Sequence, residues 1–259
     1  MIALAVILPI GSMLPWKRAK LGKTMKFLWI ALAVAFVIAA ITWVVQTDRS
    51  LIAPIGAALG AWLIVGAAAD IWQRTGRSGP AAKISRALRL PRADLGRATA
   101  HAGLGVTFIG IALLTAWQVE DIRVAQPGES FTVGQYDVTL IDVRQIQGPN
   151  YISTMAEMQI DRNGNSVARL FPEKRIYPVA NMPTTEAAID NGVFRDLYVV
   201  IGDPQGAGAW SVRTFIKPFA NWIWAGAIIM SFGGILSLTD RRFRVAAGAR
   251  KTPKGVPAE

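Results

Sequence analysis

Four apolar segments constrain the fold of this chain more than any other feature of its sequence. Each is about 20 residues long, the length of helix that crosses the roughly 30 Å hydrocarbon layer of a bilayer. They are residues 27–46, 51–72, 98–118 and 220–239. Because backbone groups in hydrocarbon must satisfy their hydrogen bonds internally, these segments predict a polytopic α-helical membrane protein.

A fifth apolar segment, residues 1–14, is too short to span a bilayer comfortably. A signal peptide carries its basic residues before the apolar run, whereas here Lys17, Arg18 and Lys20 follow it. We interpret residues 1–14 as a partial transmembrane helix, the trailing half of a longer span. The chain is then expected to be a truncated record or one piece of a split protein.

The net charge of +11 is unevenly distributed along the chain. Basic residues concentrate in 17–26, 74–97 and 241–254, whereas residues 119–217 contain more acidic than basic side chains. Basic residues in alternate loops indicate the cytoplasmic side of a membrane protein. We therefore interpret the charge as a topology signal, expect no nucleic-acid partner, and expect contacts with anionic membrane lipid.

This topology places a basic loop, residues 74–97, and a tail, residues 240–259, on the inner side of the membrane. Residues 119–217 then lie outside. Within the inner loop, residues 81–92 can form a short helix with Ile84, Ala87 and Leu88 on one face. A solvated basic loop is the alternative, and the sequence leaves both open.

Residues 119–217 have the pattern of a β domain. The stretches YDVTLIDV and STMAEMQI alternate apolar and polar residues, and Asn163–Gly164 is a strong hairpin signal. LYVVIG and WSVRTFI predict two more strands, separated by a turn over residues 202–208. About six short strands predict a small barrel or sandwich, a mostly β extracytoplasmic domain inserted before the last helix. In contrast, MPTTEAA suggests the start of a helix, with Thr184 or Thr185 as its cap, or a purely architectural turn.

His101 is the only histidine, and it lies about one turn inside the span 98–118. Ionisable side chains within a bilayer are costly and usually have a partner or a function. Ala98, Gly105, Phe108 and Ala112 fall on the same side of the helix, so small residues leave a recess beside the imidazole, with Phe108 able to pack on a ring edge. Three readings remain open: a haem ligand, a hydrogen-bonded structural histidine, or a proton relay or quinone contact.

A low-spin b-type haem usually needs two strong axial ligands. With one histidine in the chain, a second histidine ligand would have to come from another polypeptide. The chain has no cysteine, which excludes disulfides and thiolate metal sites within it.

Several motifs occur in order along the chain: AHAGLGV, GPNY, PEKRIYP, MPTTEAAID, RDLYVVIG, KPFANWIWAGAIIMSFGG and DRRFR. In this order and spacing they resemble the C-terminal part of the CcmF/NrfE family, the large subunit of the cytochrome c maturation haem lyase. The resemblance covers nearly the whole chain. It implies a multi-pass protein of the bacterial inner membrane, with residues 119–217 in the periplasm.

The resemblance also implies a function in cytochrome c-type biogenesis. The family takes haem from a periplasmic haem chaperone and helps attach it to apocytochrome c, whose thiols are kept reduced by further subunits. Family members hold a haem b between two membrane histidines, and His101 matches the second. The first histidine and a tryptophan-rich motif lie upstream in full-length members, so the N-terminal part of the same lyase is the expected partner. The membrane haem would relay electrons, with quinol as a plausible donor.

Three outer residues, Arg175, Tyr177 and Arg195, are weaker candidates for contacts with periplasmic haem or a partner protein. Arginine can bind haem propionates through paired charge-assisted hydrogen bonds. The alternative makes Glu173 and Arg195 members of structural ion pairs and Tyr177 a packed aromatic. A second hypothesis for the whole chain is a non-catalytic membrane assembly module that binds partner proteins through its periplasmic domain. A transporter is disfavoured, because apart from Asp70 the spans lack repeated charged positions.

Overall fold

The computed structural model describes residues 2–14, 21–47, 49–76 and 79–240. Lys17, Arg18 and Lys20, and the tail beyond Asp240, lie outside the described residues, so the charge pattern predicted there has no structural counterpart to compare. The described residues form two compact units. The helical unit takes its residues from 1–42, 54–109 and 223–259, and the β unit takes its residues from 43–53 and 110–222.

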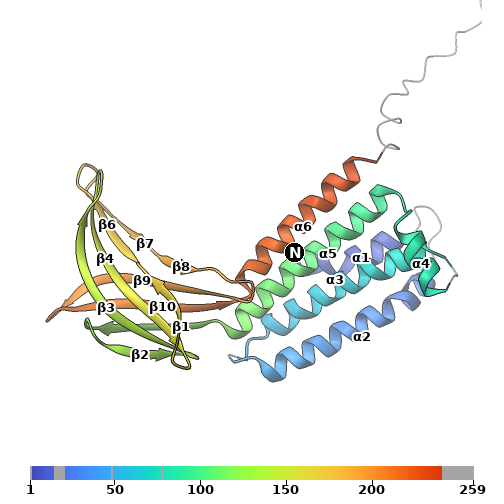
Figure 1. Ribbon diagram of the computed structural model, residues 1–259. Helices are drawn as coiled ribbons and strands as arrows, with labels where there is room; N and C mark the ends of the chain where they lie inside the picture. The colour runs from blue at the N-terminus through green and yellow to red at the C-terminus, as the bar shows by residue number, and fades with distance from the viewer. Residues whose placement is uncertain (1, 15–20, 48, 77–78, 241–259) are drawn as a thin grey trace, which may run out of the picture. The chain divides into compact units, whose positions relative to one another are not determined.

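The helices follow the apolar segments of the sequence (Figure 1). They are α1 Ile2–Met13, α2 Leu21–Val45, α3 Ile52–Arg74, α4 Pro80–Ala87, α5 Arg92–Trp117 and α6 Ala220–Leu238. Among the described residues, α2, α3, α5 and α6 are long and apolar enough to cross a membrane. Together with the β unit between α5 and α6, they confirm the predicted fold class, a helical membrane protein with a mostly β domain before its last helix.

The helix that bears His101 begins earlier than the sequence pattern predicted. It starts at Arg92, within the segment 74–97 that was expected to be a loop. Its first turn is capped from far along the chain: the Asp240 carboxylate accepts a hydrogen bond from the Ala93 N–H at 2.9 Å. First-turn N–H groups have no partner within their own helix, so a carboxylate at this position stabilises the added turns.

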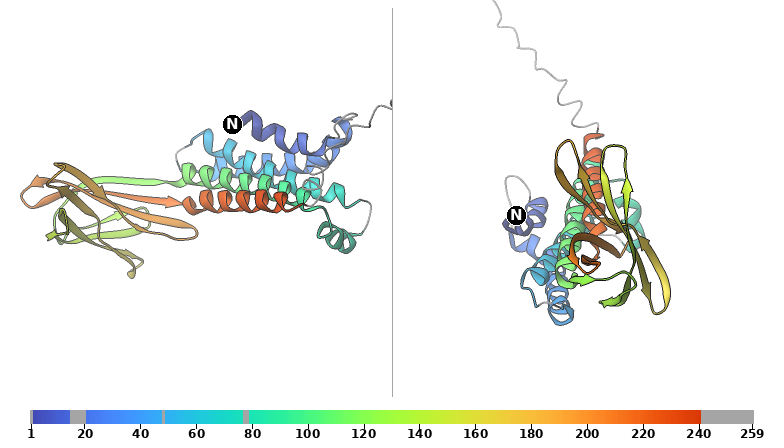
Figure 2. Two further views of the ribbon diagram at one scale, coloured as in Figure 1. Left: turned by 90° about the horizontal axis from the view of Figure 1, so that it is seen from above. Right: turned by 90° about the vertical axis from the view of Figure 1, so that its left-hand side faces the viewer.

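Close contacts between glycines join the central helices, and α5 and α6 run side by side in Figures 1 and 2. A Cβ built on Gly60 of α3 would lie 2.7 Å from the Gly105 carbonyl oxygen of α5. A Cβ on Gly233 of α6 would lie 2.6 Å from the Gly96 carbonyl oxygen of α5. Small residues therefore let these helix backbones approach each other, as is typical of packing in membranes.

The short helix α1 packs on α3 rather than standing apart. The indole nitrogen of Trp62 donates to the Val6 carbonyl at 3.1 Å, and Pro9 fills the space beside Gly66. The outer side of α1 is apolar and exposed, with Ile2 and Ile7 about 60% accessible. The interpretation of residues 1–14 as part of a longer span stays a prediction.

The β unit contains two antiparallel sheets among its described residues, one ordered β1-β10-β9-β8 and one ordered β2-β3-β4-β6-β7, with β5 also paired to β4. The strands are β1 Val119–Ala125, β2 Ser130–Val133, β3 Tyr136–Gln147, β4 Ile152–Arg162, β5 Asn165–Leu170, β6 Glu173–Tyr177, β7 Met182–Glu186, β8 Ala188–Asp190, β9 Arg195–Gly206 and β10 Ala209–Pro218. Leu140, Met158 and Ile160 of one sheet share a buried core with Leu197 and Val212 of the other. The arrangement is a sandwich.

The structure corrects three details of the predicted β domain. It has more strands than the expected six or so. Strand β9 continues to Gly206, so the turn narrows to Ala207 and Gly208, which both have positive φ. MPTTEAA does not start a helix: Met182–Glu186 is strand β7, an edge position that tolerates Pro183, and pairing with β6 outweighs the local capping signal. The Asn163–Gly164 hairpin is confirmed, with φ of 52° and 76°.

Candidate functional site

His101 lies on α5 with its side chain half-buried. Its ring makes no hydrogen bond to any other residue that the structure describes. Arg97, one helical turn earlier, and Asp70 of α3 are the charged groups close enough to influence it electrostatically. Since a structural histidine in a membrane helix would be expected to have a hydrogen-bond partner, the ring nitrogens of His101 are available for a ligand.

A cluster of four charged side chains joins α3 to α5 beside His101. The Asp70 side chain is 3% exposed, and it accepts from Arg74 Nε at 2.9 Å and from Arg97 Nη2 at 2.8 Å. Asp94 lies 3.3 Å from Arg74 and 3.5 Å from Arg97. Equal numbers of positive and negative groups balance one another, which is the condition for keeping charges in a poorly solvated place.

One donor of this cluster has no partner. Arg97 Nε is buried and makes no hydrogen bond within the described part of the chain, although Nη2 of the same guanidinium is paired. A buried unsatisfied donor costs free energy and calls for an explanation such as an absent ligand. Because Arg97 and His101 are one helical turn apart on the same side of α5, a ligand on His101 could present an acceptor to Arg97.

The residues expected to pack against a macrocycle have protein neighbours. A Cβ on Gly105 would lie 2.7 Å from both the Gly60 carbonyl oxygen and Ile64 of α3, so this side of Gly105 is filled by α3. Phe108 packs with Ala5 and Leu63 in a small apolar cluster. The recess predicted beside Gly105 is thus closed on the α3 side, and a role of Gly105 or Phe108 in contacting haem stays a prediction.

Arg175 and Tyr177 belong to a compact polar cluster on β6. Arg175 Nε donates to Glu173 Oε2 at 2.8 Å, and its guanidinium lies 4.5 Å from the centre of the Tyr151 ring. Tyr177 packs edge-on against Tyr151, with ring centroids 5.6 Å apart. Hydrogen bonding to Glu173 raises the pKa of Arg175. These side chains already have partners within the domain.

Arg195 belongs to a different cluster, and the structure does not bring it to Arg175. Its Nε donates to the Tyr136 hydroxyl at 3.2 Å, and its Nη1 pairs with Asp190. Burial lowers the pKa of Arg195, but the hydrogen bonds with Asp190 and Tyr136 outweigh that and raise it. The two outer arginines therefore do not form a single binding site among the described contacts.

Sequence reasoning missed the charged cluster beside His101. The sequence shows Asp70 only as a charged residue near the end of a span, and its charge pattern places Asp94 and Arg97 in a loop. The available signals were the spacing of Arg97 four residues before His101 and the acidic residue in an otherwise apolar window. Only the crossing of α3 and α5 pairs Asp70 with Arg97.

Glu173 yields a test of the polar cluster in the β unit. The hydrogen bond from Arg175, aided by one from Ser153, lowers the Glu173 pKa in spite of burial. Stabilisation from a carboxylate with a lowered folded-state pKa is present above the unfolded pKa, about 4.3, and is lost as pH falls through the folded pKa. Glu173→Gln should therefore lower the melting temperature of the detergent-solubilised chain near neutral pH, and the difference from wild type should shrink in acid.

Glu186→Gln is the matched control, because Glu186 is more exposed and lies 3.6 Å from the same guanidinium. It is expected to change the melting temperature less. If the difference in melting temperature between wild type and Glu173→Gln stayed constant from neutral pH to about pH 3, the lowered pKa of Glu173 would be contradicted.

Known proteins that are similar to this chain have the same kind of β domain. A family described as the CcmF C-terminal beta-sandwich matches residues 116–218. The chain is 57% identical over 251 residues to the cytochrome c-type biogenesis protein ccl1 of Rhodobacter capsulatus, covering 97% of this chain and 38% of that protein. It is 35% identical over 254 residues to the cytochrome c-type biogenesis protein CcmF of Escherichia coli K12, covering 97% of this chain and 38% of that protein.

A solved structure of the cytochrome c heme lyase CcmF shares the fold, with a TM-score of 0.67 and 20% identity over 92% of this chain and 38% of that one. The chain thus spans about 38% of the length of these relatives. Three observations support the same family: the matching motifs, the sandwich that follows α5 in the chain, and the extent of the sequence similarity. The chain belongs to the CcmF family of cytochrome c-type biogenesis proteins and corresponds to its C-terminal portion.

Proposed function

We propose that this chain acts in cytochrome c biogenesis as the C-terminal part of a haem lyase, with His101 as an axial ligand of a membrane haem b. The observation that carries the proposal is the half-buried imidazole, which has no hydrogen-bond partner among the described residues and lies one helical turn from Arg97 Nε, a buried donor that is likewise unpaired there. Membership of the CcmF family supports the biological process.

The available groups suit a haem. His101 offers a ring nitrogen as a strong axial ligand, and Arg97 offers a buried donor for a propionate. When bound, a b-type haem would supply one-electron transfer in the membrane. The Asp70 carboxylate holds Arg97 in place through its 2.8 Å contact with Nη2. The second axial ligand must come from elsewhere if it is a histidine, and we assign it to the N-terminal part of the lyase.

The remaining assignments follow from the same proposal. Residues 119–217 lie in the periplasm of a bacterium, and residues 74–97 and 240–259 lie on the cytoplasmic side of its inner membrane, as the positive-inside rule favours. The periplasmic domain meets a haem chaperone, apocytochrome c and its thiol-reducing subunits. Quinol is the proposed electron donor.

A second candidate function is a non-catalytic assembly module. One observation favours it: Arg175 and Arg195, the outer candidates for haem contact, have internal partners in Glu173 and Asp190. In this reading the β unit binds partner proteins, and the chemistry of haem attachment takes place on other chains.

Replacement of His101 by alanine in cells distinguishes the two functions. If His101 holds the haem, the variant should abolish covalent cytochrome c formation while the maturation complex still co-purifies. Stained haem protein and complex composition are the measurements. Thr115→Ala is the control, since the Thr115 hydroxyl bonds only to Ile111 of its own helix and its loss should leave cytochrome yield unchanged. Normal yield with His101→Ala would favour the assembly module.

A further inference from the structure

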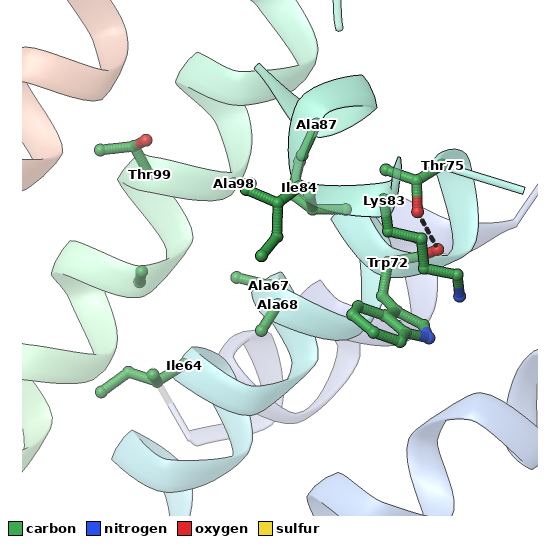
Figure 3. Close-up of a pocket in the computed structure, with 12 residues that line it drawn as sticks. Ile64, Ala67, Ala68, Trp72, Thr75, Lys83, Ile84, Ala87, Ala98 and Thr99 are labelled. Atoms are coloured by element: carbon green, nitrogen blue, oxygen red, sulfur yellow. Dashed lines mark hydrogen bonds between the residues drawn. The ribbon is translucent and has the colours of Figure 1, made fainter. Parts of the chain in front are cut away.

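A pocket of about 400 Å³ lies within the helical unit between α3, α4 and α5 (Figure 3). Five alanines line it: Ala67, Ala68, Ala87, Ala98 and Ala102. The side chains of Ile64 and Ile84 add to the apolar lining. His101 is not among the lining residues, although Ala98, Thr99 and Ala102 of the same helix are.

The pocket forms where α3 and α5 carry several alanines, next to the level at which the two helices touch. They make their close contact at Gly60 and Gly105. Toward the C-terminal end of α3, alanines on both helices leave space that larger residues would fill. The short helix α4 lies against this space through Ile84 and Ala87.

One edge of the pocket is cationic. Lys83 lines it, and Lys83 Nζ lies 3.8 Å from the centre of the Trp72 ring. Lys83 has no carboxylate partner among the described residues. Thr75 and Thr99 are the other polar lining residues, and the Thr75 hydroxyl donates to the Trp72 carbonyl at 2.8 Å. A neutral ligand would leave the ammonium of Lys83 unpaired, whereas an anionic group would pair with it.

Helix α4 itself has the character of a membrane-surface helix. In α4, Ile84 is 64% exposed, Lys83 and Arg86 supply positive charge, and there is no acidic residue. Directly after the helix, Leu88 is 78% exposed and Arg89 adds a further positive charge. Exposed apolar and basic side chains on one short helix suit the level of lipid head groups. Trp72, 48% exposed, is likewise typical of that level.

From these observations we propose that the pocket binds an anionic phospholipid of the surrounding membrane. An acyl chain occupies the alanine-lined interior, and the phosphate pairs with Lys83 beside Trp72. The volume lies within the roughly 300–1,000 Å³ typical of small-molecule pockets. A small free anion would not need the apolar lining, and a neutral lipid would not pair with Lys83. The proposal does not depend on haem binding by His101.

The test is lipid retention by the purified full chain, measured by native mass spectrometry in detergent after addition of phosphatidylglycerol or phosphatidylcholine with the same acyl chains. Wild type should retain phosphatidylglycerol preferentially. Lys83→Gln should weaken its binding about fivefold, the effect of one cation near a head group. Ala68→Phe, a substitution at an exposed lining position, should reduce retention of phosphatidylglycerol by filling the pocket.

Arg89→Gln is the matched control, because it removes the same charge from the neighbourhood of α4 at a residue that does not line the pocket. It should change retention much less than Lys83→Gln. If both variants lost the same amount of phosphatidylglycerol retention, the lipid would be held by diffuse attraction to the basic surface and not by this pocket. Equal retention of both lipids by wild type, or unchanged retention by a folded Ala68→Phe variant, would also overturn the proposal. Melting temperatures of all variants establish that they are folded.

Discussion

Replacing His101 by alanine is expected to remove the whole reduced b-type haem spectrum from the chain purified together with the N-terminal part of its lyase. A methyl group cannot bond to iron, and the chain has no second histidine to take its place. Loss of one of two strong axial ligands converts a low-spin haem into one that is weakly held or lost. Reduced-minus-oxidised absorption spectra and haem content per complex are the measurements.

His101→Met separates loss of the ligand from loss of the fold. A thioether can bond iron, and an axial methionine raises the reduction potential of a haem relative to a histidine. We therefore expect this variant to retain more haem than His101→Ala, with a more positive midpoint potential. A wild-type spectrum in both variants, with the complex intact, would show that another residue holds the haem.

Gly233→Ala is expected to destabilise the helical unit strongly, whereas Gly234→Ala is not. The added Cβ on Gly233 would lie 2.5 Å from the Ala100 nitrogen and 2.6 Å from the Gly96 carbonyl oxygen, both backbone atoms of α5. Because backbone atoms cannot rotate away, α5 and α6 would have to separate. Overpacking of this kind typically costs about 1–3 kcal/mol.

Gly234 is the neighbouring residue on the same helix, and a Cβ there would meet nothing within 4 Å. Alanine is favoured over glycine within a helix by up to about 1 kcal/mol, so Gly234→Ala should leave stability unchanged or raise it slightly. The two melting temperatures in one detergent provide the comparison. Equal shifts would mean that the close approach of α5 and α6 at Gly233 is not part of the folded protein.

Features that depend on short stretches could be predicted from the sequence. Apolar windows indicate membrane helices because hydrocarbon requires internally paired backbone and apolar side chains of a certain length. Alternation of apolar and polar residues predicted strands β3 and β4. Asn163–Gly164 predicted the hairpin between β4 and β5, because both residues tolerate positive φ. The position of His101 in a membrane helix rested on the same local evidence.

Features that depend on pairing between distant segments could not be predicted. Met182–Glu186 has a local capping signal, yet it is a strand because β6 offers hydrogen bonds along its edge. The first turn of helix α5 is capped by Asp240, which lies far along the chain. At Met182–Glu186 the local capping preference is worth about 1 kcal/mol, and pairing with β6 outweighs it.

By itself, the sequence determined which segments are helical spans, where the β domain lies and that a single histidine is available to bind a metal, since these follow from composition over one or two dozen residues. The tertiary structure alone decided which of two adjacent glycines packs against another helix, that Asp70 pairs with Arg97 beside His101, and that the short helix α4 lines a pocket rich in alanine. These depend on which helix faces meet, and that choice is made by packing between residues far apart in the chain.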